Sequence, residues 1–295
     1  MDSGVSRLAT SPAHKLGQII GNALELSALP LLEKVAQDHA LYLDKIGPRA
    51  ARGGKKLITW TDADGNKHNL DFVLERGGTD AQLGSPVAFI EVAWRRYTKH
   101  SVNKAGEIAG ALIPLRHKHS STRPFVGAVV AGVWTEGGRG QMTNQGIRVL
   151  YVPLNEIIAA FAAVGVDVDV EQGTPDAYLL DQVNAWDALT SARQAEVVDA
   201  LISATPERYA EFRRVLDEHL QRQLESVFVL PLFGELMVFQ SPADAISELR
   251  NATTNEIGSG RFIRIEVQLR FSNGDRIEAS FQSAADAVLF LEGQT

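Results

Sequence analysis

Residues Pro86–Trp94 read PVAFIEVAW, an apolar run that contains a single carboxylate, Glu91. A continuous apolar run of this length is typical of a strand that lies inside a sheet and is covered on both faces. A carboxylate buried without a partner is costly, so a cation or a proton must compensate Glu91. The stretch therefore predicts a central strand and a charged or protonated group opposite its acid.

The preceding apolar stretch, Leu70–Leu74, also contains one acid, Asp71. Strand alternation places its leucines and phenylalanine on one face and Asp71 on the other. Two carboxylates from neighbouring strands form an oxygen site suited to Mg²⁺ or Mn²⁺, and the backbone carbonyl of Val92 can add a ligand. An alternative stays open, in which one acid is a surface residue at a strand end and the other pairs with Arg95 or Arg96.

The pattern outside these two stretches predicts an α/β core with a central mixed sheet flanked by helices. Turn residues at 62–66 indicate a hairpin, and Pro114 is expected just beyond the end of a helix. The expected elements are a helix at 14–46, hairpin strands at 56–61 and 69–75, a strand at 86–94, a helix at 101–112, strands at 125–134 and 147–152, and a helix at 155–164.

Three regions are predicted along the chain. Residues 1–170 hold the α/β core, and residues 171–225 form an acidic helical segment. Residues 226–295 form a small α/β module, with a hairpin turned at 273–275, for docking or dimerisation. We expect no internal repeat and no low-complexity tract.

The composition excludes several classes of protein. The chain has 295 residues and no cysteine, so it has no disulfide, no thiolate nucleophile and no cysteine zinc site. No apolar run approaches the ~20 residues of a membrane span, and the N-terminus lacks the pattern of a secretory signal. We therefore expect a soluble cytoplasmic protein without a membrane partner.

The charge is distributed unevenly along the chain. The formal net charge is −7, yet the stretch 45–56 carries five basic residues and no acid, and the stretch 95–123 carries seven against one acid. Such stretches suit phosphate binding, although solvated loop charges explain each run equally well on its own. The nucleic-acid contacts predicted from them are Lys55, Lys56, Arg95, Arg96, Lys99, Arg116, Lys118 and Arg123.

The order of elements with these two acids resembles the PD-(D/E)XK nuclease superfamily, over roughly residues 14–164. The resemblance implies a restriction-endonuclease-like core in which Asp71 and Glu91 hold one or two Mg²⁺ ions. Ala93 stands where the family has its lysine. The resemblance suggests Lys104 as a relocated lysine, with Lys99, Arg95 and Arg96 as competitors. Glu107, one helical turn beyond Lys104, and Glu25, on the first helix and a better match than Glu33, complete the implied catalytic set.

The expected function is a metal-dependent DNA endonuclease of restriction or phage defence, acting as a homodimer so that both strands are cut. The main alternative is a catalytically inactive protein of the same fold that binds nucleic acid, because Ala93 replaces the lysine. A third reading is a scaffold subunit of a defence complex, docked to a protein partner through residues 227–295.

Overall fold

The apolar run with Glu91 forms β5 (Ser85–Arg95), the middle strand of a five-stranded sheet ordered β1-β4-β5-β6-β7. The computed structural model describes residues 11–97, 101–232, 234–252 and 264–294. The pairs β1 (Leu41–Lys45) with β4 (Phe72–Arg76) and β4 with β5 are antiparallel, whereas β6 (Phe125–Gly132) and β7 (Arg148–Pro153) are parallel. The predicted α/β class with a mixed central sheet is confirmed.

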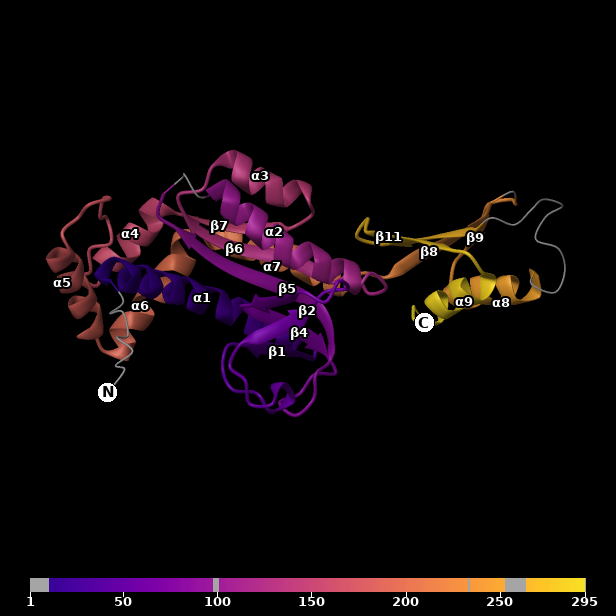
Figure 1. Ribbon diagram of the computed structural model, residues 1–295, viewed down its shortest axis with the longest axis horizontal. Coiled ribbons are helices and arrows are strands. Elements are labelled where there is room, and N and C mark those ends of the chain that lie inside the picture. Colours follow the sequence, from indigo (N-terminus) through magenta and orange to yellow (C-terminus); the bar gives the residue numbers. More distant parts are fainter. Residues whose placement is uncertain (1–10, 98–100, 233, 253–263, 295) are drawn as a thin grey trace, which may run out of the picture. The chain divides into compact units, whose positions relative to one another are not determined.

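Helices cover both faces of this sheet (Figure 1). Phe89 and Ala93 of β5 are buried in one hydrophobic cluster with the inner face of α2 (Ser101–Lys118). Trp94 lies on the opposite face of the strand by alternation and approaches Gly17 of α1 (Pro12–Asp38). The residues around Glu91 therefore lie between two helical layers.

The acidic helical segment packs onto the same core. Helices α5 and α6 pack on α1, and α6 also packs on α4, burying side chains such as Leu179 and Leu201. The helices after α2 in this region are α3 (Glu136–Asn144), α4 (Leu154–Ala162), α5 (Asp176–Asp187), α6 (Ser191–Ala204) and α7 (Pro206–Leu220).

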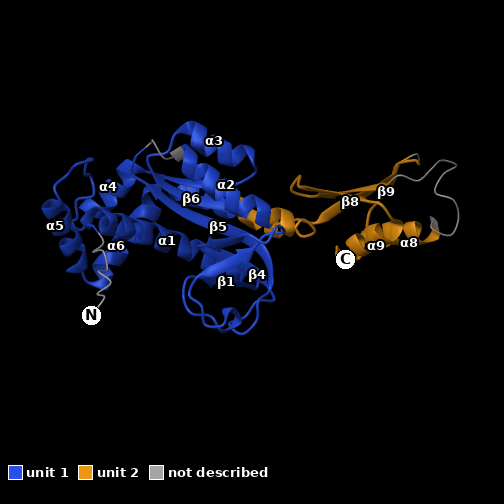
Figure 2. Cartoon of the chain, viewed as in Figure 1, with its two compact units in different colours: residues 1–115, 126–214 blue, residues 116–125, 215–295 orange. Residues whose placement is uncertain are grey.

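The chain forms two compact units, residues 1–115 with 126–214 and residues 116–125 with 215–295 (Figure 2). This division differs from the three expected regions because α5, α6 and most of α7 belong to the unit that contains the sheet. Helix α5 packs on α1, and α6 packs on α1 and α4, so these two helices do not form a separate segment.

The structure corrects three expected boundaries. The first helix ends at Asp38, and Leu41–Lys45 is strand β1, because its backbone pairs with β4. Residues 69–75 span two strands: β3 (Lys67–Leu70) pairs with β2 (Ile58–Thr61) in the expected hairpin, and the chain then bends at Asp71 into β4. Helix α2 continues past Pro114 because Leu115 is fully buried in the core.

The second unit contains an antiparallel sheet of order β11-β10-β8-β9, with two helices on one of its faces (Figure 1). The core between them is aliphatic and includes Val227, Val267 and Leu249. The elements are β8 (Leu224–Pro231), β9 (Met237–Phe239), α8 (Pro242–Ala252), β10 (Ile265–Phe271), β11 (Arg276–Phe281) and α9 (Ala284–Glu292).

The helices were also compared with the length and hydropathy of a membrane span. In the described ranges, none is long and apolar enough to cross a bilayer. The longest, α1, has an amphipathic pattern of buried residues and packs against the sheet.

Candidate metal centre

Asp71 and Glu91 lie side by side at the end of the β4/β5 ladder. In this antiparallel pair Phe72 is opposite Ile90, so one further step brings Asp71 beside Glu91. Residues opposite each other in such a pair share a face of the sheet. The backbone N–H of Val92 donates a 2.6 Å hydrogen bond to Asp71 Oδ2, which fixes the carboxylate against β5. The predicted pair of acids is therefore brought together.

The carboxylate of Glu91 lacks compensation. Its Oε1 atom is buried and has no hydrogen-bond partner in the described part of the chain. Burial, followed by the negative charge of Asp71, raises the pKa of Glu91 to about 8. Lys104 acts in the opposite direction, and Glu25 adds to the rise. A proton or a cation is needed to stabilise this group at neutral pH.

Glu25 brings a third carboxylate to the site from α1. Burial, followed by the negative charge of Asp71, raises the pKa of Glu25 to about 7. Burial also raises the pKa of Asp71, while the Val92 hydrogen bond and Lys104 oppose the rise. Glu33, the other acid considered on this helix, instead forms an exposed 2.9 Å ion pair with Lys45. Glu25 is therefore the acid of α1 that interacts electrostatically with the site.

Lys104 is the cation that interacts with both strand acids. It lies in the first turns of α2, next to the buried Ala105, and its positive charge lowers the pKa of Asp71 and of Glu91. Its Nζ atom lies 3.1 Å from Glu107 Oε2, and 61% of the Glu107 side chain is exposed. The structure thus places Lys104 and Glu107 together, with Lys104 closer to the buried side.

Ala93 occupies the position where the resemblance would place a lysine. Only 5% of Ala93 is exposed, and it packs in the cluster that contains Ala105 and Ala109 of α2. A lysine at 93 would need space that the close approach of α2 fills. The positive charge is therefore supplied from the helix by Lys104, whereas β5 carries the acid.

The oxygen atoms of Asp71, Glu91 and Val92 could supply some of the ligands of a hard divalent cation. In the described ranges, no group of three or more histidine, cysteine, aspartate or glutamate side chains is close enough to hold a metal ion. Mg²⁺ commonly keeps several waters and needs only one or two protein carboxylates. The orphaned Glu91 oxygen and the adjacent Asp71 carboxylate meet that requirement. Val92 directs its N–H toward Asp71, and in an extended strand its carbonyl faces the same side.

Arg95, the last residue of β5, and Arg96, which follows it, have local partners. Arg96 donates to the carbonyls of Val168, at 2.6 Å, and Val170, and it also contacts the Asp169 carboxylate. Arg95 donates to its own neighbour's carbonyl, Trp94 O, at 3.2 Å. The open alternative, in which Arg95 or Arg96 pairs with an acid of the site, therefore has no support among the described contacts. Lys99, also predicted to bind nucleic acid, lies outside the described residues.

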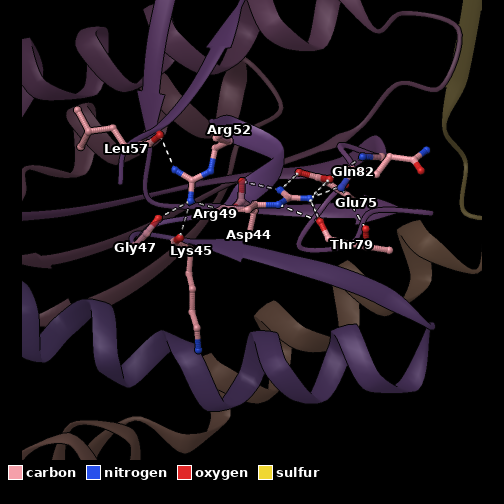
Figure 3. Close-up of polar contacts among 10 residues, drawn as sticks. Asp44, Lys45, Gly47, Arg49, Arg52, Leu57, Glu75, Thr79 and Gln82 are labelled. Atoms are coloured by element: carbon pink, nitrogen blue, oxygen red, sulfur yellow. Dashed lines mark hydrogen bonds and ion pairs between the residues drawn. The ribbon is translucent and has the colours of Figure 1, made fainter. Parts of the chain in front are cut away.

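The first basic stretch is largely neutralised within the fold (Figure 3). Arg49, 2% exposed, forms ion pairs with Glu75 at 2.7 Å and Asp44 at 2.8 Å. Arg52 pairs with Asp44 at 3.2 Å and donates to the Gly47 carbonyl. In contrast, Lys55 and Lys56 are exposed and remain candidates for phosphate contacts.

The other predicted nucleic-acid contacts, Arg116, Lys118 and Arg123, belong to the second unit. Burial, aided by the positive charge of Arg123, lowers the pKa of Arg116, so this guanidinium is partly desolvated. The Arg123 carbonyl accepts a 3.0 Å hydrogen bond from His219 Nε2. Lys118 is exposed at the end of α2. The two units are described separately, so these residues stay a separate prediction.

Sequence reasoning missed a pocket of about 410 Å³ beside the end of β5. Its wall includes Trp94 of β5, Tyr97 just after this strand, Gly17 of α1 and the segment 170–174. The last segment is distant in sequence and is attached through Arg96, so no local pattern could have indicated that it closes the pocket. The aromatic residues Trp94 and Tyr97 near the end of β5 were the feature of the sequence that could have indicated this pocket.

No family model, curated protein or solved structure matches this chain. The assignment of function therefore depends on the geometry and chemistry of the site.

Proposed function

We propose that this protein is a metal-dependent endonuclease with a restriction-endonuclease-like core, which hydrolyses phosphodiester bonds of DNA. The observation that carries the proposal is the orphaned, buried Oε1 of Glu91 beside Asp71, with Lys104 as the neighbouring cation. Such a site is unfavourable when empty and ionised, and it becomes favourable with a divalent cation. The resemblance to the PD-(D/E)XK superfamily implies a role in restriction or phage defence.

Each residue has a distinct role in this proposal. Asp71 and Glu91 would hold Mg²⁺ or Mn²⁺, with the Val92 carbonyl as a further ligand. The ion, when bound, lowers the pKa of a water and stabilises negative charge on the phosphate. Lys104 would hold the attacking water by donating a hydrogen bond, and Glu107 or Glu25 would orient waters around the ion.

The exposed cations would bind the DNA backbone. Lys55 and Lys56 have free surfaces for phosphate contacts, and Arg116, Lys118 and Arg123 are candidates in the second unit. Such contacts position the duplex without reading its sequence, and they weaken as salt rises. Arg96 is the least suited of the predicted set because its guanidinium is already bound to the segment 168–170.

The decisive experiment is cleavage of supercoiled plasmid DNA by the full chain with Mg²⁺ or Mn²⁺. We expect Glu91→Gln to lower the cleavage rate by at least about a hundredfold, because a metal ligand and its charge are lost. Lys104→Ala is expected to lower the rate while metal binding persists. Glu33→Gln is the matched control, because Glu33 is an exposed acid of α1 with a surface ion pair.

The outcomes separate the three readings. Cleavage by the wild type that Glu91→Gln abolishes supports the endonuclease. A wild type that retards the plasmid in a gel but never cuts it supports the inactive nucleic-acid-binding protein, for which Ala93 in place of a lysine is the favouring observation. A wild type that neither cuts nor retards DNA contradicts both and leaves the scaffold protein.

A further inference from the structure

The second unit contains two copies of one ββα motif, contrary to the expectation of no internal repeat. The segments 239–245, FQSPADA, and 281–287, FQSAADA, differ only at their fourth position. Each serine caps its helix in the same way: Ser241 Oγ lies 3.2 Å from the Asp244 N–H, and Ser283 Oγ lies 3.1 Å from the Asp286 N–H. The repeat is hard to recognise in the sequence because, outside these two short segments, the strands of the two halves share a burial pattern but not residue identity.

The pairing registers of the strands show which residues of the two halves are equivalent. Val227 is opposite Phe239 in the first hairpin, and Ile265 is opposite Phe281 in the second. The first strands of the halves pair antiparallel, with Val229 opposite Val267. These two valines are equivalent positions, so a local two-fold axis relates the halves and passes between them.

The two halves differ on the sheet face that the helices leave open. The inner faces are alike, since Val227, Val229, Ile265 and Val267 are all buried. The outward positions are apolar in the first half and polar at the equivalent positions of the second half. The equivalent outward pairs are Phe228 with Glu266, Leu230 with Gln268, and Val238 with Ser280.

This difference shows what the fold itself requires. The second half forms the same motif with polar outward residues, so apolar residues at these positions are not needed for folding. The first half nevertheless exposes 56% of Leu236 and 52% of Val238. Leu236 lines a surface hollow of about 530 Å³ together with Phe228 and Leu230, and the second half contributes Glu266, Arg270 and Glu278 to the same hollow. Arg270 stacks over the Phe228 ring at 4.4 Å.

The two edges of the sheet differ in the same way. Among the described strands, β9 and β11 are the edge strands. The outward residues of β11 include the exposed Arg276 and Glu278, and such charges discourage a further strand from pairing. The described part of β9 carries Val238, with Leu236 just before it, and no charge. Among the described strands, β9 is therefore the edge strand that lacks charged side chains.

We propose that Phe228, Leu230, Leu236 and Val238 form a self-association surface, which binds the same surface of a second copy of this chain with the two β9 edges antiparallel. A single edge strand is complementary to itself under a two-fold axis. The four side chains are uncharged, so the axis brings no like charges together among them. The inference does not depend on the nuclease proposal.

A nucleic acid is a poor occupant for this surface. From residue 227 to residue 295 the chain has nine acids against five arginines and no lysine. The net negative charge opposes a polyanion, and an apolar face offers no phosphate contact. A second copy satisfies both the apolar surface and the uncharged edge strand.

Sedimentation velocity of the full chain over about 1 to 100 µM tests the inference. We expect a monomer–dimer equilibrium in the wild type. Val238→Lys is expected to weaken dimerisation by about tenfold or more, because the dimer would bury two ammonium groups against apolar side chains. Ser280→Lys, the same change at the equivalent position of the other half, is expected to alter it by no more than about twofold.

Leu236→Ser, outside any strand, is a second variant that tests the same surface if Val238→Lys fails to fold, as judged by circular dichroism. A wild type that is monomeric throughout this range overturns the inference. Equal weakening by Val238→Lys and Ser280→Lys also overturns it, since the effect would then not be confined to the apolar half. Loss of dimerisation leaves plasmid cleavage as a separate readout, so the two proposals fail distinguishably.

Discussion

Two groups of buried charges lie in the first unit, and they are opposite in composition. Around Arg49, two arginines face Asp44 and Glu75, with ion pairs of 2.7 to 3.2 Å and further bonds to backbone carbonyls. Around Glu91, three carboxylates are opposed by Lys104 among the described residues, and one carboxylate oxygen has no described partner. In the first group each carboxylate faces a guanidinium, although Asp44 Oδ2 and Arg52 Nε have no hydrogen-bond partner among the described residues. The second group has an excess of negative charge that a proton or a cation must compensate.

The comparison distinguishes structural from functional burial of charge. A buried ion pair with satisfied hydrogen bonds fixes local geometry, here the loop that joins β1 to β2 and the turn after β4. A buried excess of one sign raises the free energy of the empty site, and binding of a cation relieves it. The basic stretch 45–56 looked functional in the sequence, yet much of its charge serves the first purpose.

The largest effect on stability is expected from Arg49→Met. The change leaves Glu75 buried without its cation and Asp44 with Arg52 only, and we expect a loss of about 3–5 kcal/mol in the free energy of unfolding measured with urea. Arg193→Met, in an exposed pair with Glu196, is the control and should cost about 0.5 kcal/mol or less. A loss near that of the control would remove the distinction between the two groups.

A smaller effect on the free energy of unfolding is expected from Glu91→Gln in metal-free buffer. This substitution should stabilise the folded protein, whereas Arg49→Met destabilises it. The pKa of Glu91 is about 8 in the folded protein against an ordinary value of 4.5, so the folded state binds more protons between these values. The wild type should therefore lose stability as pH rises from 5 to 8, on the order of 2 kcal/mol. Glu91→Gln should flatten this slope, and urea unfolding across the pH range measures it.

The control for this slope is Glu33→Gln, which changes an exposed acid of α1 and should leave the wild-type slope unaltered. Glu25 should contribute in the same direction as Glu91 up to pH 7, because its pKa is about 7. A wild type that gains stability between pH 5 and 8 would contradict the view of an uncompensated site.

The smallest effect is stabilisation by Mg²⁺. At a concentration tenfold above the dissociation constant, binding should add about 1.4 kcal/mol to the free energy of unfolding of the wild type. Asp71→Asn and Glu91→Gln should show no such gain, whereas Arg193→Met should keep it. Equal stabilisation of all four proteins would indicate nonspecific ion binding and would remove the metal from the proposed site.

Local sequence predicted the parts of this protein that depend on hydrophobic pattern. The central strand, the 58–70 hairpin and the two acids of the site follow from alternation and from the cost of burying Glu91. Pattern failed at Leu41–Lys45, whose strand conformation depends on pairing with β4, at sequence separations of 27 to 35 residues. It failed at Pro114 for the same reason, since packing of Leu115 sustains the helix.

The sequence by itself determined that two carboxylates would meet within an apolar sheet, because residue type and alternation are local properties. Only the tertiary structure decided which cations remain available. Arg49, Arg52 and Arg96 are bound by groups that no local pattern connects to them, while the positive charge of Lys104 acts on Asp71 and Glu91. The charge of a side chain belongs to the sequence, but its compensation depends on neighbours that folding brings together.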